Sequence, residues 1–518
     1  MALPAFTVTA ANSPPSTSPH PPLTHFVDKN AATTTYRRSK FQLALKNLSN
    51  NLDSTASWTS LIANHCRNGR LIEAVSEFTL MRISGFEPNH VTFVTLLSGC
   101  AHFPAQGLSL GSALHAYARK LGLDTQNVKV GTAIIDMYSK FGLLELARLS
   151  FDHMDVKNKV TWNTMVDGFM RNGDLKNAVK MFDEIPERDV ISWTALIGGF
   201  VKNGLFEEAL VWFQEMQLSG VEPDYVTMIS VLSACANLGA LGISLWLHRF
   251  ILQREFKNNV RVNNTLIDMY CRCGCVELAC QVFDKMPERS LVSWNSIIVG
   301  LAVNGHAMDA LQYFNLMQTE RFKPDAVTFT GVLTACSHAG MVEEGLKYFK
   351  AMKRVHRISP RIEHYGCIVD LYSRAGRLED ALGVIKNMHV KPNEVVLGSI
   401  LAACRNLKDV RLAERLMHYI YELDPGGDSN HVLLSNIYAA VGSWHGASTV
   451  RKKMKDLGIQ KRPGISSIET DGVVNEFVAG DRSHIHSQQI YAMLELLSGE
   501  LRVSGYVEDN VNESYECG

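Results

Sequence analysis

The chain has 518 residues, of which 46% are hydrophobic, and its formal net charge is −1. A chain of this length exceeds what one hydrophobic core usually serves, so it contains either several globular domains or one elongated array of repeats. The near-zero net charge excludes the overall basic excess that is typical of nucleic-acid-binding domains, so any such affinity must come from the local placement of side chains.

Residues 1–50 differ in composition from the rest of the chain. They contain many Ser, Thr, Ala and Pro residues and several basic residues, and Asp28 is their one acidic residue. This composition is typical of a disordered organellar transit peptide, whereas a secretory signal needs a compact apolar segment. An ordinary disordered tail has a similar composition and stays an alternative.

The sequence lacks the features of a membrane protein or a small secreted protein. No run of about 18 apolar residues occurs, and the most apolar stretch, 238–252, is interrupted by His248 and Arg249. Neither a transmembrane helix nor a membrane partner is therefore expected. The 11 cysteines are spread along the chain rather than densely spaced, so we expect reduced thiols.

The stretch 190–224 shows most clearly the unit that the chain repeats. Its first half carries large apolar residues at the spacing of one helix face, namely Trp193, Leu196, Ile197 and Phe200. Asn203 and Gly204 then predict a helix end. A second apolar stripe follows, made of Ala209, Leu210, Phe213 and Met216, and it ends before Gly220 and Pro223. One such hairpin cannot bury both stripes alone, so the pattern predicts an all-α stack of helical hairpins.

Ten repeats of this kind follow one another between residues 55 and 393. They run 55–89, 90–127, 128–158, 159–189, 190–224, 225–259, 260–290, 291–325, 326–361 and 362–393. Repeats of 35 residues that end in EPN, EPD or KPD are each followed by a repeat of 35 to 38 residues with SGCA, SACA or TACS in its first half. Two of the 31-residue repeats carry the sequence IDMY. The lengths therefore follow a recurring triplet.

These repeats resemble those of pentatricopeptide repeat (PPR) proteins. The resemblance lies in tandem 35-residue hairpins with the openings WNTMVDGF, WTALIGGF and WNSIIVGL. The alternation of standard, long and short repeats is similar to that of the plant PLS subclass. A tetratricopeptide array would have a Trp-Leu-Gly-Tyr pattern, which is missing here. The resemblance implies an α-solenoid superhelix of tandem helical hairpins.

The C-terminal part departs from the repeat pattern. Residues 394–461 form two degenerate repeats, 394–427 and 428–461, which resemble the paired E motifs of the subclass. Residues 462–509 contain two alternating runs around Asp471-Gly472, which predict a β-hairpin, and a helix over about 485–503 with an apolar stripe. The stripe consists of Ile490, Met493, Leu494 and Leu497. This part resembles the E+ extension of PPR editing factors, and residues 510–518 form a tail where deaminase-bearing relatives continue.

The resemblance implies a base-reading role for the fifth and last residues of each repeat, which together recognise one base of single-stranded RNA. The pairs and the bases they favour in the family are Thr59 with Asn89 and Thr132 with Asn158 for adenine, Asn163 with Asp189 and Asn295 with Asp325 for uracil, Thr194 with Asp224 for guanine, and Asn264 with Ser290 for cytosine. The remaining repeats depart from the code, with Val94, Ile229, Thr330 and Gly366 at the fifth position. The predicted site is A-n-A-U-G-n-C-U-n-n, and the last repeat would lie about four nucleotides before the edited cytidine.

The second residues of flanking repeats are implied to sandwich the base. Those that fit are Val160, Ile191, Val226, Val292 and Val327. Ala56, Lys129, Arg261 and Glu363 depart from the pattern, and Lys129 and Arg261 either contact phosphates or are solvated. A purely structural alternative also stays open, because Asn and Thr near a helix start often cap the helix and Asp after Pro is often a turn residue.

No catalytic, metal-binding or cofactor-binding residues are expected. A zinc deaminase needs His-x-Glu followed by Pro-Cys-x-x-Cys, yet none of the 18 histidines is followed two residues later by Glu, and Cys-x-x-Cys is missing. Cys271, Cys273 and Cys275 cluster at a turn between helices, where small buried thiols are favoured over a zinc site. His484 and His486 lie in a polar linker. The sequence therefore predicts a protein that is not an enzyme.

The resemblance implies a site-recognition factor for C-to-U editing of a chloroplast transcript. A deaminase-bearing PPR protein would supply catalysis in trans, together with small organellar editing cofactor proteins for which the long repeats offer docking places. Mitochondria remain an alternative location. Two other functions also stay open, namely RNA stability or splicing without editing, and a helical-repeat scaffold that binds proteins.

Overall fold

The computed structural model describes residues 54–423, 429–456, 458, 465–470, 473–478 and 481–504. The predicted transit peptide 1–50, the Asp471-Gly472 turn and the tail 510–518 lie outside the described residues. The chain divides into two compact units, Met1–Met137 and Tyr138–Gly518.

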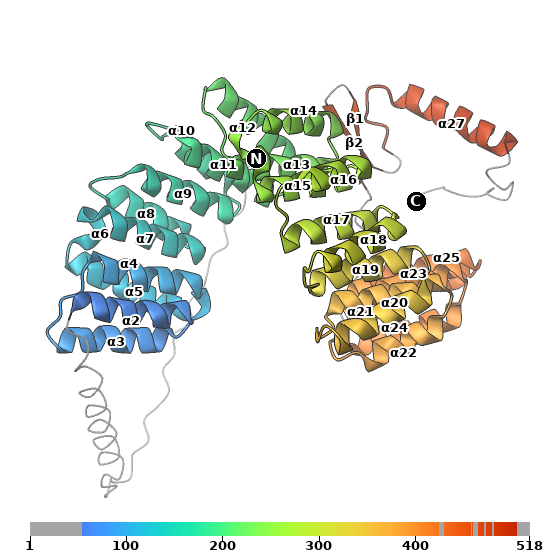
Figure 1. The fold of residues 1–518 in the computed structure, drawn as a ribbon, viewed down its shortest axis with the longest axis horizontal. Helices are drawn as coiled ribbons and strands as arrows, with labels where there is room; N and C mark the ends of the chain where they lie inside the picture. Colours follow the sequence, from blue (N-terminus) through green and yellow to red (C-terminus); the bar gives the residue numbers. More distant parts are fainter. Residues whose placement is uncertain are drawn as a thin grey trace, which may run out of the picture. The chain divides into compact units, whose positions relative to one another are not determined.

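The first compact unit consists of antiparallel helical pairs (Figure 1). Its helices are α2 (Thr55–Arg67), α3 (Leu71–Ile83), α4 (His90–His102), α5 (Pro104–Lys120) and the short α6 (Leu123–Gln126), and α7 (Val128–Lys140) begins in it. Helix α2 packs against both α3 and α4, and α4 packs against α5.

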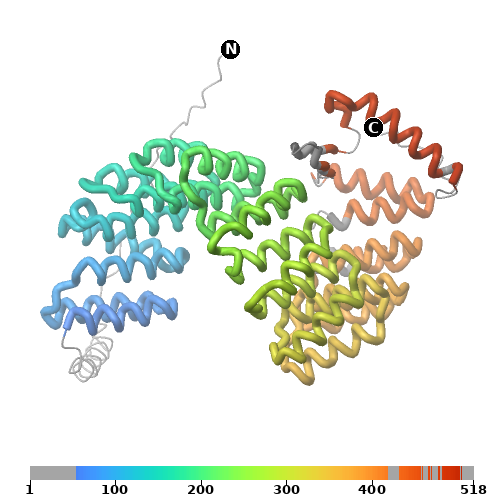
Figure 2. The backbone as a smooth tube through the Cα atoms, turned by 45° about the horizontal axis from the view of Figure 1, so that its top comes forward, coloured from blue at the N-terminus to red at the C-terminus, as the bar shows by residue number. Residues whose placement is uncertain are grey.

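The second compact unit continues the same arrangement (Figure 2). Its first helices are α9 (Lys159–Arg171), α11 (Val190–Lys202), α13 (Tyr225–Leu238), α15 (Val260–Arg272), α17 (Leu291–Val303), α19 (Ala326–His338), α21 (Ile362–Arg374), α23 (Glu394–Asn406) and α25 (Ser429–Ala440). Its second helices are α8 (Leu144–His153), α10 (Leu175–Asp183), α12 (Phe206–Leu218), α14 (Leu241–Leu252), α16 (Val276–Lys285), α18 (Ala307–Thr319), α20 (Val342–Arg354), α22 (Leu378–Asn387), α24 (Val410–Leu423) and α26 (Trp444–Asp456). The 3-10 helix η1 (Glu255–Asn258) follows α14. Each first helix from α9 onward packs against the first helix of the next repeat, so the first helices form a continuous row. The predicted all-α array of helical hairpins is confirmed.

The apolar stripes of each hairpin form the core between repeats. Trp193, Leu196, Ile197 and Phe200 of α11 are all buried. The Trp193 ring meets the Phe182 ring of the preceding repeat edge to face, with 4.8 Å between ring centroids. Each such side chain contributes about 1.5–3 kcal/mol when it is removed from water. Contacts between neighbouring repeats therefore contribute to the stability of the stack.

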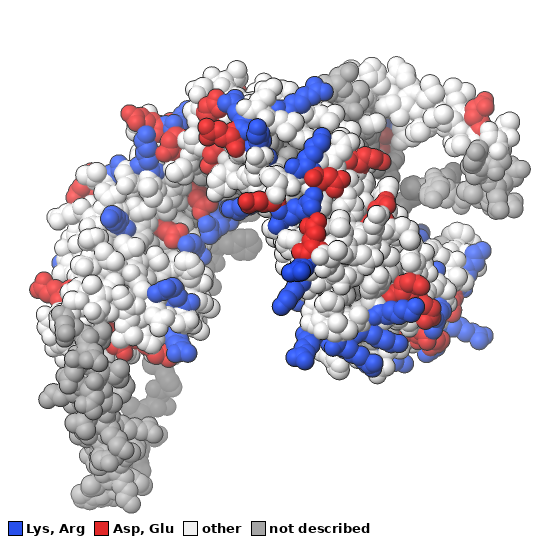
Figure 3. All heavy atoms as spheres, in the orientation of Figure 1, with Lys and Arg blue, Asp and Glu red and all other residues white. Residues whose placement is uncertain are grey.

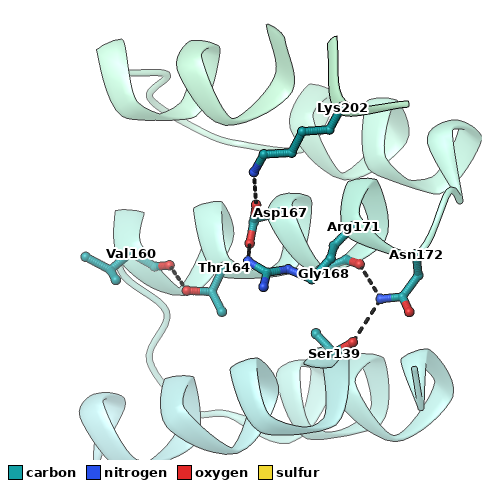
Figure 4. Close-up of polar contacts among 8 residues, drawn as sticks. All are labelled: Ser139, Val160, Thr164, Asp167, Gly168, Arg171, Asn172 and Lys202. Carbon is teal, nitrogen blue, oxygen red and sulfur yellow. Dashed lines mark hydrogen bonds and ion pairs between the residues drawn. The ribbon is translucent and has the colours of Figure 1, made fainter. Parts of the chain in front are cut away.

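Asparagine and glycine residues set the spacing between neighbouring first helices (Figure 4). Asn172, which follows α9, donates from Nδ2 to the carbonyl of Ser139 in α7 at 2.9 Å and to that of Gly168 in its own helix at 2.7 Å. Asn203 and Asn304 make the same two bonds in later repeats. A Cβ atom added at Gly168 would lie 2.9 Å from Ser139 Cβ, which is closer than Cβ contacts allow. Gly168 allows the two first helices to approach closely, and the Asn172 amide links them through its hydrogen bond to Ser139.

The C-terminal extension contains a β-hairpin and a helix. Strand β1 (Ile465–Thr470) pairs antiparallel with β2 (Val473–Val478), with Ile465 opposite Val478. The predicted helix is α27 (Ser487–Val503), but its apolar stripe is not buried by the described residues: Met493, Leu494 and Leu497 are each more than half exposed. Helical periodicity in the sequence predicts an apolar stripe, but it does not show which residues cover that stripe in the folded protein. Among the described helices, none is long and apolar enough to cross a membrane.

Candidate nucleic-acid interface

The last residue of each predicted pair caps the first helix of the following repeat. Its side chain accepts the N–H of the third residue of that repeat, as in Asp189 to Ser192 (2.9 Å), Asp224 to Thr227 (2.8 Å) and Asn89 to Thr92 (3.1 Å). Asn158, Ser290 and Asp325 cap α9, α17 and α19 in the same way. The capping role that the sequence left as an alternative is therefore present, and it holds these side chains at the junction between repeats.

The fifth residue lies one turn into its helix and reaches the same junction. Three predicted pairs are in direct contact: Asn295 Nδ2 donates to Asp325 Oδ1 (3.1 Å), Asn163 Nδ2 to Asp189 Oδ1 (3.5 Å), and Asn264 Nδ2 to Ser290 Oγ (3.4 Å).

The threonine pairs are joined less directly. The hydroxyls of Thr59 and Thr194 bond those of Thr92 (2.8 Å) and Thr227 (2.6 Å), and these in turn bond Asn89 and Asp224. Thr132 and Asn158 belong to different compact units, and their pairing stays a prediction.

The helix cap decides which polar atom of the last residue remains available. The cap occupies Oδ1 of Asp and Asn alike, because only an oxygen accepts the backbone N–H. The second carboxylate oxygen of Asp189, Asp224 or Asp325 is then left as an acceptor. In Asn89, the Nδ2 group is left as a donor. The identity of the last residue thus sets the polarity that the junction displays.

The fifth residue is polarised by its own bonds. In Asn163 and Asn295, one N–H of the side-chain amide donates to the aspartate, and the second N–H remains available as a donor. Thr227 must donate its single proton to the Asp224 carboxylate, so the Thr194 proton goes to Thr227 and a lone pair of Thr194 is left. Thr59 likewise engages its proton within the protein, with the carbonyl of Thr55 2.8 Å away. Asparagine therefore displays a donor and threonine an acceptor.

The predicted sandwiching residues are exposed aliphatic side chains beside these junctions. Their exposed fractions are 60% for Val160, 63% for Ile191, 37% for Val226, 59% for Val292 and 49% for Val327. Sequence analysis missed two more, because Val91 (47% exposed) and Val395 (75% exposed) hold the same second position of their repeats. The positional rule itself identifies them.

A hollow of about 630 Å³ lies at the repeat 291–325, and both a polar pair and exposed second-position residues line it. The pair Asn295 and Asp325 lines it together with Val292 and Val327, the second residues of the two adjoining repeats. Its volume lies within the usual range for sites that hold small ligands. A hollow lined by two exposed valines and a polar pair is suited to a flat polar ring.

On the face that Figure 3 shows, charges of both signs lie close together. Basic residues at the end of first helices pair with aspartates one turn earlier, as in Arg171 with Asp167, Arg272 with Asp268 (3.0 Å) and Arg374 with Asp370 (2.8 Å). In Figure 4, Asp167 lies between Arg171 and Lys202, whose Nζ is 4.0 Å from its carboxylate. These exposed pairs are weak and salt-sensitive, so the cations remain accessible to an anionic ligand.

The aspartates of the two uracil-type pairs are held ionised. Partial burial acts to raise the pKa of Asp189, but hydrogen bonds from Ser192 and Asn163 outweigh it and lower that pKa below its ordinary value. The pKa of Asp325 is lowered in the same way, against its burial, by bonds from Thr328 and Asn295. Both groups therefore act as acceptors at neutral pH.

The cysteine cluster contributes to packing. Burial raises the pKa of Cys271 to about 12, and its Sγ lies directly against Gly300 of the next first helix. Such a thiol behaves as a small apolar side chain. Within the described ranges, no group of three or more His, Cys, Asp or Glu residues is placed to hold a metal ion.

An array of helical hairpins with a polar pair at each junction defines a class of repeat proteins, and the sequence matches one such family. The PPR repeat family matches residues 53–102, 188–237 and 289–338, and the PPR repeat matches 160–190, 264–291, 327–355 and 363–392. The E motif matches 407–469 and the E+ motif 474–501.

Relatives in Arabidopsis thaliana extend this match over most of the chain. A chloroplastic pentatricopeptide repeat-containing protein is 62% identical over 460 residues, which cover 89% of this chain and 92% of that protein. The chloroplastic protein ELI1 is 44% identical over 452 residues, covering 87% of this chain and 70% of ELI1. A mitochondrial pentatricopeptide repeat-containing protein is 40% identical over 448 residues, covering 86% of this chain and 65% of that protein.

The chain belongs to the pentatricopeptide repeat family, and its E and E+ motifs confirm the predicted PLS-type E group. The crystal structure of PPR10 from maize has the same fold, with a TM-score of 0.59 and 18% sequence identity. The match covers 82% of this chain and 62% of the maize protein.

Proposed function

We propose that this protein binds single-stranded RNA of an organelle and recognises the site of a C-to-U editing event. Each repeat junction would receive one base between the exposed aliphatic second residues of adjoining repeats. The polar pair at the floor would contact the base edge, which single-stranded RNA leaves open.

The observation that carries this proposal is the polarity of the described pairs. Thr194 with Asp224 displays two acceptors, which complement the N1–H and N2–H donors of guanine. Thr59 with Asn89 displays an acceptor and a donor, which complement N6–H and N1 of adenine. Asn163 with Asp189 displays a donor and an acceptor, which complement the carbonyl and N3–H of uracil. The polarities agree with the bases that the family resemblance implies for these pairs. A donor followed by an acceptor separates uracil from cytosine, whose exocyclic amine donates and whose N3 accepts, although the O6 and N1–H of guanine have the same polarity as uracil.

Phosphate contacts would come from the basic residues at the ends of first helices. The side chains of Arg171, Lys202, Arg272 and Arg374 are at least 46% exposed. The first three lie on first helices that carry predicted pairs, and Arg374 lies at the end of α21. Contacts of this kind position a strand without selecting its sequence. Because each arginine already has an aspartate partner, we expect the affinity for RNA to depend on the polar base-reading pairs as well as on charge.

The editing role is supported by the E and E+ motif matches, at 407–469 and 474–501. We assign deamination to a deaminase-bearing PPR protein acting in trans, with small organellar editing cofactor proteins. A chloroplast location is favoured because the 62% identical relative is a chloroplastic protein, and the composition of residues 1–50 suits a transit peptide. A mitochondrial location is the alternative.

The decisive experiment is deep sequencing of chloroplast and mitochondrial cDNA from plants that lack this protein. We expect loss of conversion at one or a few plastid cytidines preceded by a sequence resembling A-n-A-U-G-n-C-U-n-n. If every cytidine is still converted, the editing role is wrong, and altered transcript levels or splicing would then indicate a stability or splicing factor. If RNA metabolism is unchanged as well, a protein-binding scaffold becomes the leading account.

A further inference from the structure

A buried hydroxyl lies beneath each described base-reading pair. It belongs to the third residue of the following repeat, and the residues at this position after the six predicted pairs are Thr92, Thr161, Ser192, Thr227, Ser293 and Thr328. All of them are fully buried. After the repeats whose fifth residue departs from the code, the same position holds Val130, Val262, His364 and Val396. The hydroxyl therefore accompanies the polar pairs and is missing from the others.

The capping bond made by the last residue of a repeat does not require this hydroxyl. Asn127, Asn259 and Asn393 cap their helices through the N–H of a third-position valine, at 3.2, 3.3 and 3.1 Å. The bond from the capping side chain thus forms without a hydroxyl. In four of the other repeats the hydroxyl adds a second capping contact, because it accepts the backbone N–H of Asn158, Asp189, Ser290 or Asp325. What the valine repeats lack is a polar fifth residue, since Val94, Ile229 and Gly366 stand there. The hydroxyl therefore accompanies the six predicted pairs, and in four of these repeats it also completes a capping box.

The contacts show what the hydroxyl does. Thr328 Oγ1 lies 2.6 Å from Asn295 Oδ1 and 3.0 Å from Asp325 Oδ1. Neither oxygen can donate, so the single Thr328 proton is shared between them and lies mainly on the shorter contact, to Asn295 Oδ1. This bond holds the amide oxygen inward, so that Nδ2 faces Asp325 and the remaining N–H is left for a ligand. An amide without this bond is free to turn over, which would exchange its donor for an acceptor.

We propose that the third-position hydroxyl is a positioning residue for base reading, a role that rests on the proposed function. It orients the fifth side chain so that the junction displays one polarity before RNA binds. Such pre-organisation lowers the cost of ordering on binding and penalises the wrong base. The hydroxyl itself is buried beneath the pair and does not contact RNA.

Threonine and serine perform this role unequally. Ser192 Oγ bonds Asp189 at 2.8 Å, but no bond joins it to Asn163, whose buried Oδ1 has no hydrogen-bond partner. Asn264, above Ser293, also has a buried Oδ1 without a partner. The chain thus offers an internal comparison, because Asn163 with Asp189 and Asn295 with Asp325 are the same pair above a serine and a threonine. We expect the repeat 291–325 to distinguish uracil more sharply than the repeat 159–189.

The test uses the full chain and synthetic single-stranded RNA containing A-n-A-U-G-n-C-U-n-n. The fourth and eighth bases, read by Asn163 with Asp189 and by Asn295 with Asp325, are replaced one at a time by adenine, and dissociation constants are compared. We expect Thr328→Val to reduce discrimination at the eighth base about tenfold, since one buried amide oxygen loses its donor. Discrimination at the fourth base should not change. Thr328→Ser should retain an intermediate value, and Ser192→Thr should sharpen discrimination at the fourth base.

Controls separate positioning from folding. Valine is native at the third position of other repeats, so Thr328→Val should still fold, with a lowered thermal unfolding midpoint because the Asp325 N–H and the buried Asn295 amide oxygen lose their partner. Val262→Thr, below an apolar fifth residue, should leave discrimination unchanged. If Thr328→Val discriminates as the wild type does, or loses affinity equally at both bases, the positioning role is wrong. If Asn295→Ala still discriminates at the eighth base, or the wild type shows no preference there, the base-reading assignment itself fails.

Discussion

At the level of single residues, one side chain serves both the fold and the proposed recognition. Asp224 and Asn89 cap their helices equally well, because each uses one oxygen for the backbone N–H. They differ in the atom that remains, an oxygen in Asp and an NH₂ group in Asn. Under the proposed function, a substitution at this position would change base preference with little effect on stability.

Asp224→Asn tests this separation of roles. The variant keeps its cap and displays a donor in place of an acceptor, so preference at the fifth base of the site should shift from guanine to adenine by about tenfold or more. Competition binding with the two RNAs measures the shift, and thermal unfolding should be nearly unchanged. Asp174→Asn is the matched control, because Asp174 caps the second helix α10 and belongs to no pair. A variant that still prefers guanine would show that the free carboxylate oxygen does not read the base.

The lowered pKa values of Asp189 and Asp325 predict how stability depends on pH. Their contribution is fully present above the ordinary carboxyl pKa of about 3.9 and is lost as pH falls through the lower folded-state values. We expect the unfolding temperature of the wild type to fall more steeply below about pH 4 than that of an Asp189→Asn/Asp325→Asn double variant. Equal slopes in a series of melts from acid to neutral pH would contradict this account.

At the level of helices, the distance between neighbouring repeats depends on glycine. Gly198 and Gly199 are adjacent in α11 but face different surroundings. A Cβ at Gly199 would lie 2.7 Å from Met170 Cβ in the preceding first helix, whereas one at Gly198 would have Ser230 Oγ as its nearest neighbour at an ordinary 3.4 Å. Gly199 is therefore required for the close approach of the preceding first helix, whereas Gly198 is not.

Gly199→Ala should destabilise the protein and Gly198→Ala should not. We expect the first to cost about 1–3 kcal/mol, because the helices must move apart or Met170 must leave its place. The second should be neutral or stabilise the chain by up to about 1 kcal/mol, because alanine restricts the unfolded chain and favours the helix. Chemical denaturation of both variants measures the difference. Equal effects would mean that Met170 adapts without cost.

At the level of the whole molecule, the repeats and the C-terminal extension carry different properties. The described repeats contain the polar pairs and the exposed valines, whereas α27 presents an apolar stripe that the described residues leave exposed. Exposed apolar surface of this kind is typical of sites that contact another protein. Recognition of RNA and recruitment of a partner are therefore separable under the proposed function.

Removal of residues 465–518 tests this separation. The shortened chain should bind the predicted RNA as the full chain does, because no pair lies in the removed part, but it should fail to restore editing in plants that lack the protein. Fluorescence anisotropy measures binding, and cDNA sequencing measures editing. Restored editing by the shortened chain would show that the extension is not needed for recruitment.

The sequence by itself determined the class of fold, and its resemblance to the family predicted which residues pair. Trp193, Leu196, Ile197 and Phe200 predict a buried helical stripe because periodicity is a local property, and they are buried. The positions of Asn295 and Asp325 within their repeats marked them as a pair, although the bond between them joins residues 30 positions apart.

Only the tertiary structure decided which atoms of each pair remain available. The polarity of Asn295 depends on Thr328 in the next repeat, and the role of Gly199 depends on Met170 in the preceding one. Asn163 and Asn295 are alike in sequence position, yet one amide oxygen is bonded and the other is buried without a partner. Periodicity places a residue on a helix face, whereas hydrogen-bond direction and close approach are set by side chains that meet across the junction of two repeats.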